Sequence, residues 1–401
     1  MNLPATIDIL ICGGGTSGAA LAGILARDTD ANVVLLEAGP DYGPLDSGRW
    51  PADLLDARRI PRTHGWGYAG SAHSAHVEET PFERAKVIGG CSSHNGCVAL
   101  LGHRRDYDAW AELGNDGWDW YSVAPAFERA LRTLRVATPA ESDVTPFHQS
   151  FIDGAVQFGI PMSADMNDPD ETAGVGASPV NVVDGTRWNT SLAYLDPVRR
   201  KGNLTVVGDA LVDRIEVSGG RAVAAHVVID GTPQRIAAGR IVLAAGAYGS
   251  PAVLLRSGIG PTAETSAIGI APVHDLPGVG RALADHPAVN LRYRSSAQLD
   301  REMEEFARGH WSPDEQSLAK ARSSICREAF DIHIYAVAGW RTDDGDYVYG
   351  VAVSSVHPKS TGAITLRAAD PTTPPRIDHN YLSDPDGEDL RVLLDGVEMT
   401  R

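Results

Sequence analysis

The stretch IDILICGGGTSG, residues 7–18, decides the fold class of this 401-residue chain. A short β-rich run over residues 7–11 leads into the spacing Gly13-x-Gly15-x-x-Gly18. An Ala/Leu-rich helix is expected over about 19–26, followed by a buried strand over 33–36. Strand, glycine-rich turn, helix and parallel strand form the βαβ unit of dinucleotide-binding folds. The sequence therefore predicts an α/β domain on a parallel sheet.

Each glycine of this turn has its own physical role in such a site. Gly13 permits the tight turn, Gly15 lets backbone amides approach a pyrophosphate, and Gly18 lets the helix pack closely on the strand. Thr16 and Ser17 open the helix, whose positive dipole end faces the phosphates. Glu37 ends the second strand, where a carboxylate accepts hydrogen bonds from ribose hydroxyls and repels a 2′-phosphate. One such site is expected, for FAD or NAD, and a glycine turn in an unrelated α/β fold is the alternative.

The rest of the N-terminal two thirds mixes loops, helices and short strands. Residues 40–85 lack clear periodicity, which indicates loops or a lid. Residues 106–135 are expected to be helical, with Trp110 and Leu113 among the buried positions. Three runs predict a meander of consecutive strands, at 204–207, 211–217 and 222–229. A buried strand over 241–245 and a helix over 250–257 follow.

Beyond residue 290 the pattern changes to longer alternating strands. The runs 333–337, 347–353 and 363–366 predict an antiparallel sheet with one open face. An amphipathic helix begins near residue 386, and four apolar positions are expected to face the core: Leu390, Leu393, Leu394 and Val397.

Composition and charge exclude several classes of protein. The formal net charge is −17 and no Lys/Arg block interrupts it, so nucleic-acid binding is not expected. No apolar run approaches the length of a membrane span. Only six residues precede the first expected strand, so no signal peptide is expected. The four cysteines are too few for a disulfide framework and lack zinc-site spacing, so reduced thiols in the cytoplasm and no metal site are expected.

Three further segments resemble one known family, the glucose-methanol-choline oxidoreductases. The first is AKVIGGCSSHNG at 85–96, which is similar to the family's first signature. The second, GAYGSPAVLLRSGIG at 246–260, matches the second signature, and PGVGRALADHP at 277–287 resembles the Asp-His run. The resemblance implies FAD and disfavours an NAD-dependent dehydrogenase. It also implies oxidation of an alcohol to an aldehyde or ketone by hydride transfer to flavin N5.

The same resemblance implies two discontinuous domains. Residues 1–155 and 191–289 are expected to bind FAD on a parallel sheet, with the lid loop at about 40–85. Residues 156–190 and 290–401 are expected to bind the substrate on a mostly antiparallel sheet. The expected cofactor-binding residues are Gly13, Gly15, Thr16, Ser17, Gly18, Glu37, Val87, Gly90, His94, Asn95, Val98, Val212 and Ala245.

His94 makes the first signature similar to that of the choline oxidase branch. There, the matching histidine is bonded to the flavin 8α carbon, and a neutral imidazole is a suitable nucleophile for that bond. A covalent flavin on His94 is therefore expected. The alternative is a buried histidine that is hydrogen-bonded to a backbone carbonyl.

Two departures from that branch point to a small-molecule alcohol other than choline. Ala288 stands where the branch has a glutamate that pairs with the substrate's trimethylammonium group, and Gly96 stands where it has a serine. Trp66 offers an aromatic ring to a cation. His286 and His333 match positions that line the branch's substrate pocket, although structural histidines are the alternative. His333 is expected on the same strand face as Asp331 and Tyr335.

The family's catalytic pair, a histidine followed by His or Asn, aligns with no residue of 1–401. The segments STGAITL at 360–366 and PRID at 375–378 resemble the start of the region that carries it. The base is therefore expected beyond Arg401, and a catalytically incomplete flavin-binding fragment is the alternative function. The electron acceptor is expected to be oxygen or another carrier.

Overall fold

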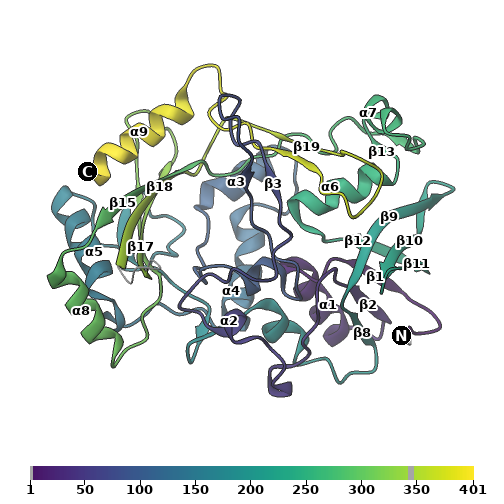
Figure 1. Cartoon of the computed structure of the whole chain (residues 1–401), viewed down its shortest axis with the longest axis horizontal. Helices are drawn as coiled ribbons and strands as arrows, with labels where there is room; N and C mark the ends of the chain where they lie inside the picture. The colour runs from purple at the N-terminus through teal and green to yellow at the C-terminus, as the bar shows by residue number, and fades with distance from the viewer. Residues whose placement is uncertain (1–2, 342–346) are drawn as a thin grey trace.

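The expected βαβ unit is present in the computed structural model, which describes residues 3–341 and 347–401 (Figure 1). Strands β1 (Ile9–Cys12) and β2 (Val33–Leu36) are parallel, and α1 (Thr16–Asp28) connects them. The sheet order is β12-β1-β2-β8, with β12 at Arg240–Leu243 and β8 at Leu204–Val207. All four residues of β2 are buried, as its continuous apolar run predicts.

Two predictions about this region need correction. The run at 204–207 is not part of the meander, because β8 pairs in parallel with β2. The meander is β9 (Ala210–Ser218), β10 (Arg221–Ile229) and β11 (Thr232–Ala237), and a turn at Asp209, with φ 53°, separates it from β8. Strand β12 is partly exposed rather than buried, because Val242 and Leu243 line a cavity. The expected helix that follows is α6 (Gly246–Arg256).

A five-stranded antiparallel sheet forms the other end of the molecule (left in Figure 1). Its order is β15 (Ala288–Arg294), β18 (Tyr347–Ser355), β17 (Ile332–Arg341), β16 (Glu315–Ala321) and β5 (Gly174–Ala177). Helices α5 (Pro146–Phe158) and α9 (Glu388–Thr400) pack on it and share its hydrophobic core. The strands expected at 333–337 and 347–353 are therefore confirmed. The run at 363–366 instead forms β19 (Ala363–Thr365), which pairs with β20 (Arg376–Asp378) alone.

The buried face of α9 differs from the expected one. Leu393 is buried, but Leu390 and Leu394 are 47% and 52% exposed. Gly396 brings the helix close to the sheet, since a Cβ there would lie 2.3 Å from Val353 Cγ1. This close approach rotates the helix so that Val392, Leu393 and Gly396 face the strands.

Residues 106–135 form two surface helices, α3 (Arg104–Glu112) and α4 (Trp120–Thr133). Trp110 is 45% exposed and Leu113 81% exposed, so the prediction that both are buried is wrong. The helices pack mainly on each other through aromatic contacts around Tyr107, and such a two-helix contact covers only one side of each.

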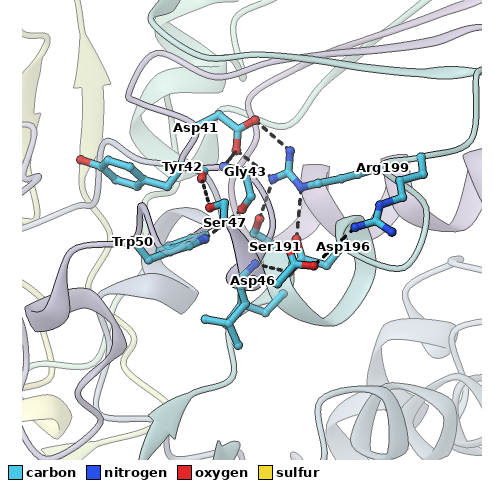
Figure 2. Close-up of polar contacts among 12 residues, drawn as sticks. Asp41, Tyr42, Gly43, Asp46, Ser47, Trp50, Ser191, Asp196 and Arg199 are labelled. Atoms are coloured by element: carbon cyan, nitrogen blue, oxygen red, sulfur yellow. Dashed lines mark hydrogen bonds and ion pairs between the residues drawn. The ribbon is translucent and has the colours of Figure 1, made fainter.

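The segment after β2 is mostly loop, as expected, but its first part is tightly fastened. The Arg199 guanidinium makes two 2.8 Å bonds to the Asp41 carboxylate and one of 3.1 Å to Asp196 (Figure 2). Asp196 in turn accepts the Leu45 N–H at 2.9 Å, and Trp50 Nε1 donates to the Gly43 carbonyl. Residues 41–50 are thereby held against the turn that follows η4 (Ser191–Leu195).

The remaining elements are short, except for the 11-residue helix α8. They are η1 (Leu45–Ser47), α2 (Ala52–Leu55), β3 (Ala69–Gly70), β4 (Thr80–Pro81), η2 (Gly90–Ser93), η3 (Glu141–Asp143), β6 (Val182–Val183), β7 (Thr186–Arg187), β13 (Ile259–Gly260), α7 (Thr262–Ala267), β14 (His274–Asp275) and α8 (Ala297–Ala307). In the described part of the chain, no helix has the length and apolar character needed to span a membrane.

Candidate active site

A cavity of about 740 Å³ opens where the parallel sheet meets the glycine-rich turn. Its walls come from the end of β1, the start of α1, the end of β2, the meander, α6 and residues 371–375. Eight of the expected cofactor-binding residues line it: Gly13, Gly15, Thr16, Ser17, Glu37, Gly90, Val212 and Ala245. A volume of this size suits a ligand larger than a single small metabolite.

The first glycine-rich turn has the geometry that anion binding requires. Gly13 has φ 113°, and a Cβ at Gly18 would lie 1.9 Å from the Gly13 carbonyl oxygen, so α1 can approach β1 only without a side chain there. Gly15 is different, because a Cβ there would meet only Gly90 Cα at 3.8 Å. The first turn of α1 carries no acidic residue. The positive end of the helix is therefore available to a phosphate in the cavity.

Glu37 is buried at the end of β2, beside this turn. Its Oε2 accepts the Gly14 N–H and its Oε1 accepts the Gly39 N–H, both at 2.9 Å. Burial raises the pKa of Glu37 to about 7, although the two backbone donors oppose that rise. The carboxylate thus shapes both loops as well as lining the cavity. The sequence pattern did not indicate this second role.

The second glycine-rich segment lies directly on the first. Gly90, with φ 53°, approaches Gly15 so closely that a Cβ there would lie 2.6 Å from Gly15 Cα. Thr16 Oγ1 accepts the Ser92 N–H at 3.2 Å, which ties the two loops together. Val87 is fully buried beneath them and does not line the cavity. The loops form one cradle around residues 13–18 and 89–92.

His94 and Asn95 lie beyond the cavity wall. His94 is 8% exposed, and its Nε2 lies 2.6 Å from the Thr63 carbonyl oxygen. This is the hydrogen bond that the alternative interpretation of His94 predicts. Asn95 uses its side-chain oxygen to accept the Cys97 N–H at 3.2 Å.

Trp66, expected to offer its ring to a cation, lies in the wall with several residues that were not expected. Trp66 and Tyr68 stack with ring centroids 5.4 Å apart, and Lys86 lies 4.9 Å from the Trp66 ring centroid. Arg84 lies 5.0 Å from the Tyr248 ring centroid. Lys86 and Tyr248 are inside the two family-like segments, so their placement could have been inferred. Residues 371–375 close one side; only Pro375 lies in a segment that resembles the family, and 371–374 carry no signal beyond a proline-rich turn.

A second, smaller cavity of about 220 Å³ lies on the antiparallel sheet. It brings together His286, His333 and Val98, three of the expected site residues, with Ala288 and Tyr335. The pKa of His333 is lowered to about 3 by burial, and its Nε2 has no hydrogen-bond partner in the described structure. His286 is more exposed, and desolvation lowers its pKa while Asp285 opposes the shift. Both imidazoles are therefore neutral near pH 7.

Two further polar residues near these cavities were missed. His379 is buried, and its Nε2 lies 2.7 Å from the Tyr248 hydroxyl at the wall of the larger cavity. Asp285 accepts a 2.9 Å hydrogen bond from the Tyr381 hydroxyl. Of the two residues expected on the strand face of His333, Tyr335 lines the cavity with it, whereas Asp331 precedes β17 and accepts hydrogen bonds from the Ser323 N–H and hydroxyl. Across the described residues, no group of three or more His, Cys, Asp or Glu side chains could hold a metal ion.

Comparisons with known proteins agree with this arrangement. The family model described as GMC oxidoreductase matches residues 7–288. Choline oxidase of Arthrobacter globiformis is 29% identical over 98% of this chain and 75% of its own length. Oxygen-dependent choline dehydrogenase of Brucella melitensis is 31% identical over 94% of this chain and 74% of its own. The crystal structure of pyridoxine 4-oxidase from Mesorbium loti superimposes with a TM-score of 0.85 at 25% identity, covering 99% of this chain and 81% of that one.

The matched residues include both glycine-rich loops, the second signature and the Asp-His run at 285–286. More than half of the chain therefore fits one family model. The chain belongs to the GMC family of FAD-dependent oxidoreductases.

Proposed function

We propose that this protein oxidises a small alcohol to an aldehyde or ketone, with FAD in the larger cavity and the alcohol in the smaller one. One observation carries the proposal: residues 90–98 run from the first cavity to the second. Gly90 and Cys91 line the larger cavity, and Val98 lines the smaller one. A single loop thus connects the cradle of the cofactor with a histidine-lined pocket.

The residues of the chain would divide the work as follows. The glycine loops and the start of α1 would hold the pyrophosphate, and Glu37 would accept a ribose hydroxyl with the lone pairs that Gly14 and Gly39 leave free. FAD, when bound, supplies the acceptor for the hydride from the carbinol carbon. His333 Nε2, neutral and without a partner, would accept the hydrogen bond of the substrate hydroxyl and orient it. His286 would help to orient the same hydroxyl from the exposed side of the pocket.

We also propose a division into two units that follows the two sheets. The parallel sheet with its meander would bind FAD, and the antiparallel sheet would bind the alcohol. Helix α5 packs on β5 and β16. Ile152 of this helix and Val144, just before it, belong to the hydrophobic core of the antiparallel sheet. We therefore move the expected boundary at residue 155 to about residue 145. The four unpaired cysteines support the proposed location in the cytoplasm.

Anaerobic mixing of the FAD-loaded protein with primary and secondary alcohols tests the proposed reaction. At least one alcohol should bleach the flavin absorbance, and oxygen or another added acceptor should restore it. His333→Asn and His286→Asn should slow bleaching by at least roughly tenfold if they orient the hydroxyl. A flavin that no alcohol reduces would support the fragment interpretation instead.

We further propose that His94 carries the flavin covalently. His94 does not line the larger cavity, but Cys91, three residues before it, does, so the imidazole would have to leave the Thr63 carbonyl and turn toward the cavity. The imidazole would bond to the 8α carbon, and because attachment releases two electrons and two protons, it needs an acceptor such as dioxygen. Acid precipitation should leave the yellow colour in the wild-type pellet and release it from His94→Ala. His103→Asn is a matched control, since His103 is also 8% exposed and asparagine can keep its helix cap. Complete release of FAD from the wild-type protein would leave His94 with only its bond to Thr63.

A further inference from the structure

The smaller cavity contains a carboxyl group that the family-like segments do not include. Glu315, at the start of β16, lines it together with His286, His333 and Tyr335. Among the described residues that line the cavity, Glu315 is the only acidic one, and none is Lys or Arg. Within the described structure, its carboxylate forms no hydrogen bond or ion pair. The positive charge of Arg187 acts on it only from a distance.

Gly96 makes room for this carboxylate. A Cβ at Gly96 would lie 2.2 Å from Glu315 Oε2 and 2.8 Å from its Cδ. The backbone of Gly96 is not in the left-handed region, so its conformation does not require glycine. Space for Glu315 is therefore the reason that the structure offers for a glycine here. Any side chain at position 96 would push the carboxylate away from its present place.

The groups around Glu315 do not neutralise the charge of its carboxylate. Burial raises the pKa of Glu315, and the positive charge of Arg187 only partly opposes this. The Arg187 guanidinium already donates hydrogen bonds to neighbouring backbone carbonyls and to Cys97 Sγ. The two histidines of the cavity are neutral. Glu315 is half-buried. A carboxylate that is largely desolvated without a cation or donor is unfavourable, so a ligand that supplies both would be bound preferentially.

We propose that Glu315 is a specificity-determining residue that selects alcohols carrying a protonated amine. The inference rests on the proposed function, because it names the substrate class of the same pocket. The amine N–H groups would donate to the Glu315 carboxylate while the hydroxyl end meets His333. Charge-assisted hydrogen bonds of this kind are the strong ones. A quaternary ammonium group is disfavoured, since it has no N–H, and among the described lining residues Tyr335 is the only Phe, Tyr or Trp.

Equilibrium titration of the FAD-loaded full chain with two matched alcohols tests the assignment. The probes are 3-amino-1-propanol and 1-butanol, in which a methyl group replaces the ammonium group. The wild-type protein should bind the amino alcohol roughly ten- to a hundredfold more tightly. Glu315→Gln should abolish this preference. Asp314→Asn is the control, because Asp314 is the adjacent carboxyl and does not line the cavity, and it should keep the preference.

Gly96→Ala provides a second variant that leaves the carboxyl group in the chain but displaces it. It should reduce the preference for the amino alcohol at least severalfold. An equal affinity of the wild-type protein for both probes, or a preference that survives in Glu315→Gln, overturns the inference.

The same samples separate failure of this inference from failure of the proposed function. Flavin reduction by 1-butanol without any preference for the amine would refute only the role of Glu315. Tight, Glu315-dependent binding of the amine without flavin reduction by any alcohol would refute the proposed oxidation and leave the assignment of Glu315 standing.

Discussion

Gly15 and Gly18 stand three residues apart in one turn, yet a side chain would do different damage at each. A Cβ at Gly18 meets the Gly13 carbonyl oxygen at 1.9 Å, whereas a Cβ at Gly15 meets nothing closer than 3.8 Å. We expect Gly18→Ala to lower the free energy of unfolding by about 1–3 kcal/mol, because α1 must move off β1. Gly15→Val should fold normally but fill the phosphate site and weaken FAD binding roughly ten- to a hundredfold.

Urea unfolding of both variants, with FAD titration by flavin fluorescence, measures the two effects. Normal stability of Gly18→Ala, or wild-type FAD affinity of Gly15→Val, would contradict the roles given to these glycines.

Glu37 makes the stability of the FAD-free protein depend on pH. Burial raises its folded-state pKa from 4.5 to about 7. Below pH 4.5 the carboxyl is protonated in both states, and between pH 4.5 and about 7 the unfolded chain ionises first. Its contribution to stability is therefore lost as pH rises through this window, by up to about 3 kcal/mol. Glu37→Gln should remove this part of the pH dependence.

The measurement compares unfolding free energies of the wild-type protein and Glu37→Gln at pH 5 and pH 8. Parallel pH profiles for the two proteins would show that Glu37 is not the group responsible.

At the scale of elements, one arginine fastens a long connection to the parallel-sheet unit. The side chains of Arg199 and Asp41 are only 12% and 15% exposed, whereas those of Arg200 and Asp46 are 89% and 71% exposed. Breaking a largely buried ion pair is costly because it leaves an uncompensated charge, and exposed pairs contribute little. Arg199→Met should therefore cost about 3 kcal/mol and speed amide exchange over residues 41–50. Its neighbour Arg200→Met should change neither quantity measurably.

Hydrogen-exchange mass spectrometry of the two variants gives the readout. Equal exchange over 41–50 in both would mean that packing of Trp50, rather than the ion pair, holds this segment.

The sequence predicted most elements but not all of their partners. The run LTVV at 204–207 has the same appearance in a meander as in a parallel sheet, and only its pairing with β2 distinguishes the two. Likewise, helical spacing marked Leu393 and Leu394 as equally apolar, while the glycine contact at Gly396 decides which of them is buried. Trp110 and Leu113 were expected to be buried. They are exposed because α3 and α4 lie on the surface and cover only one side of each other. Pairing and helix rotation depend on contacts distant in sequence, which periodicity does not contain.

In the whole molecule, the candidate site combines segments that sequence motifs identify with segments that no motif identifies. The turn at 13–18 and Glu37 could be assigned from spacing, because the βαβ unit fixes where they lie. His286 and His333 came from a resemblance, and the structure puts both in one cavity. Glu315 and residues 371–374 had no local signal. Strand pairing brings Glu315 to its cavity, and the loop before β20 brings the other residues to theirs. Both placements depend on contacts between segments that are distant in sequence.

This chain is expected to hold one FAD in the cavity formed by its glycine loops. The most direct test is the flavin content of the purified full chain after incubation with excess FAD and removal of free cofactor. Visible absorption and nucleotide analysis of the denatured protein should give about one FAD per chain and no NAD, since the sequence offers a single glycine fingerprint. A protein that stays colourless, or that retains NAD instead, would show that the glycine loops do not hold FAD.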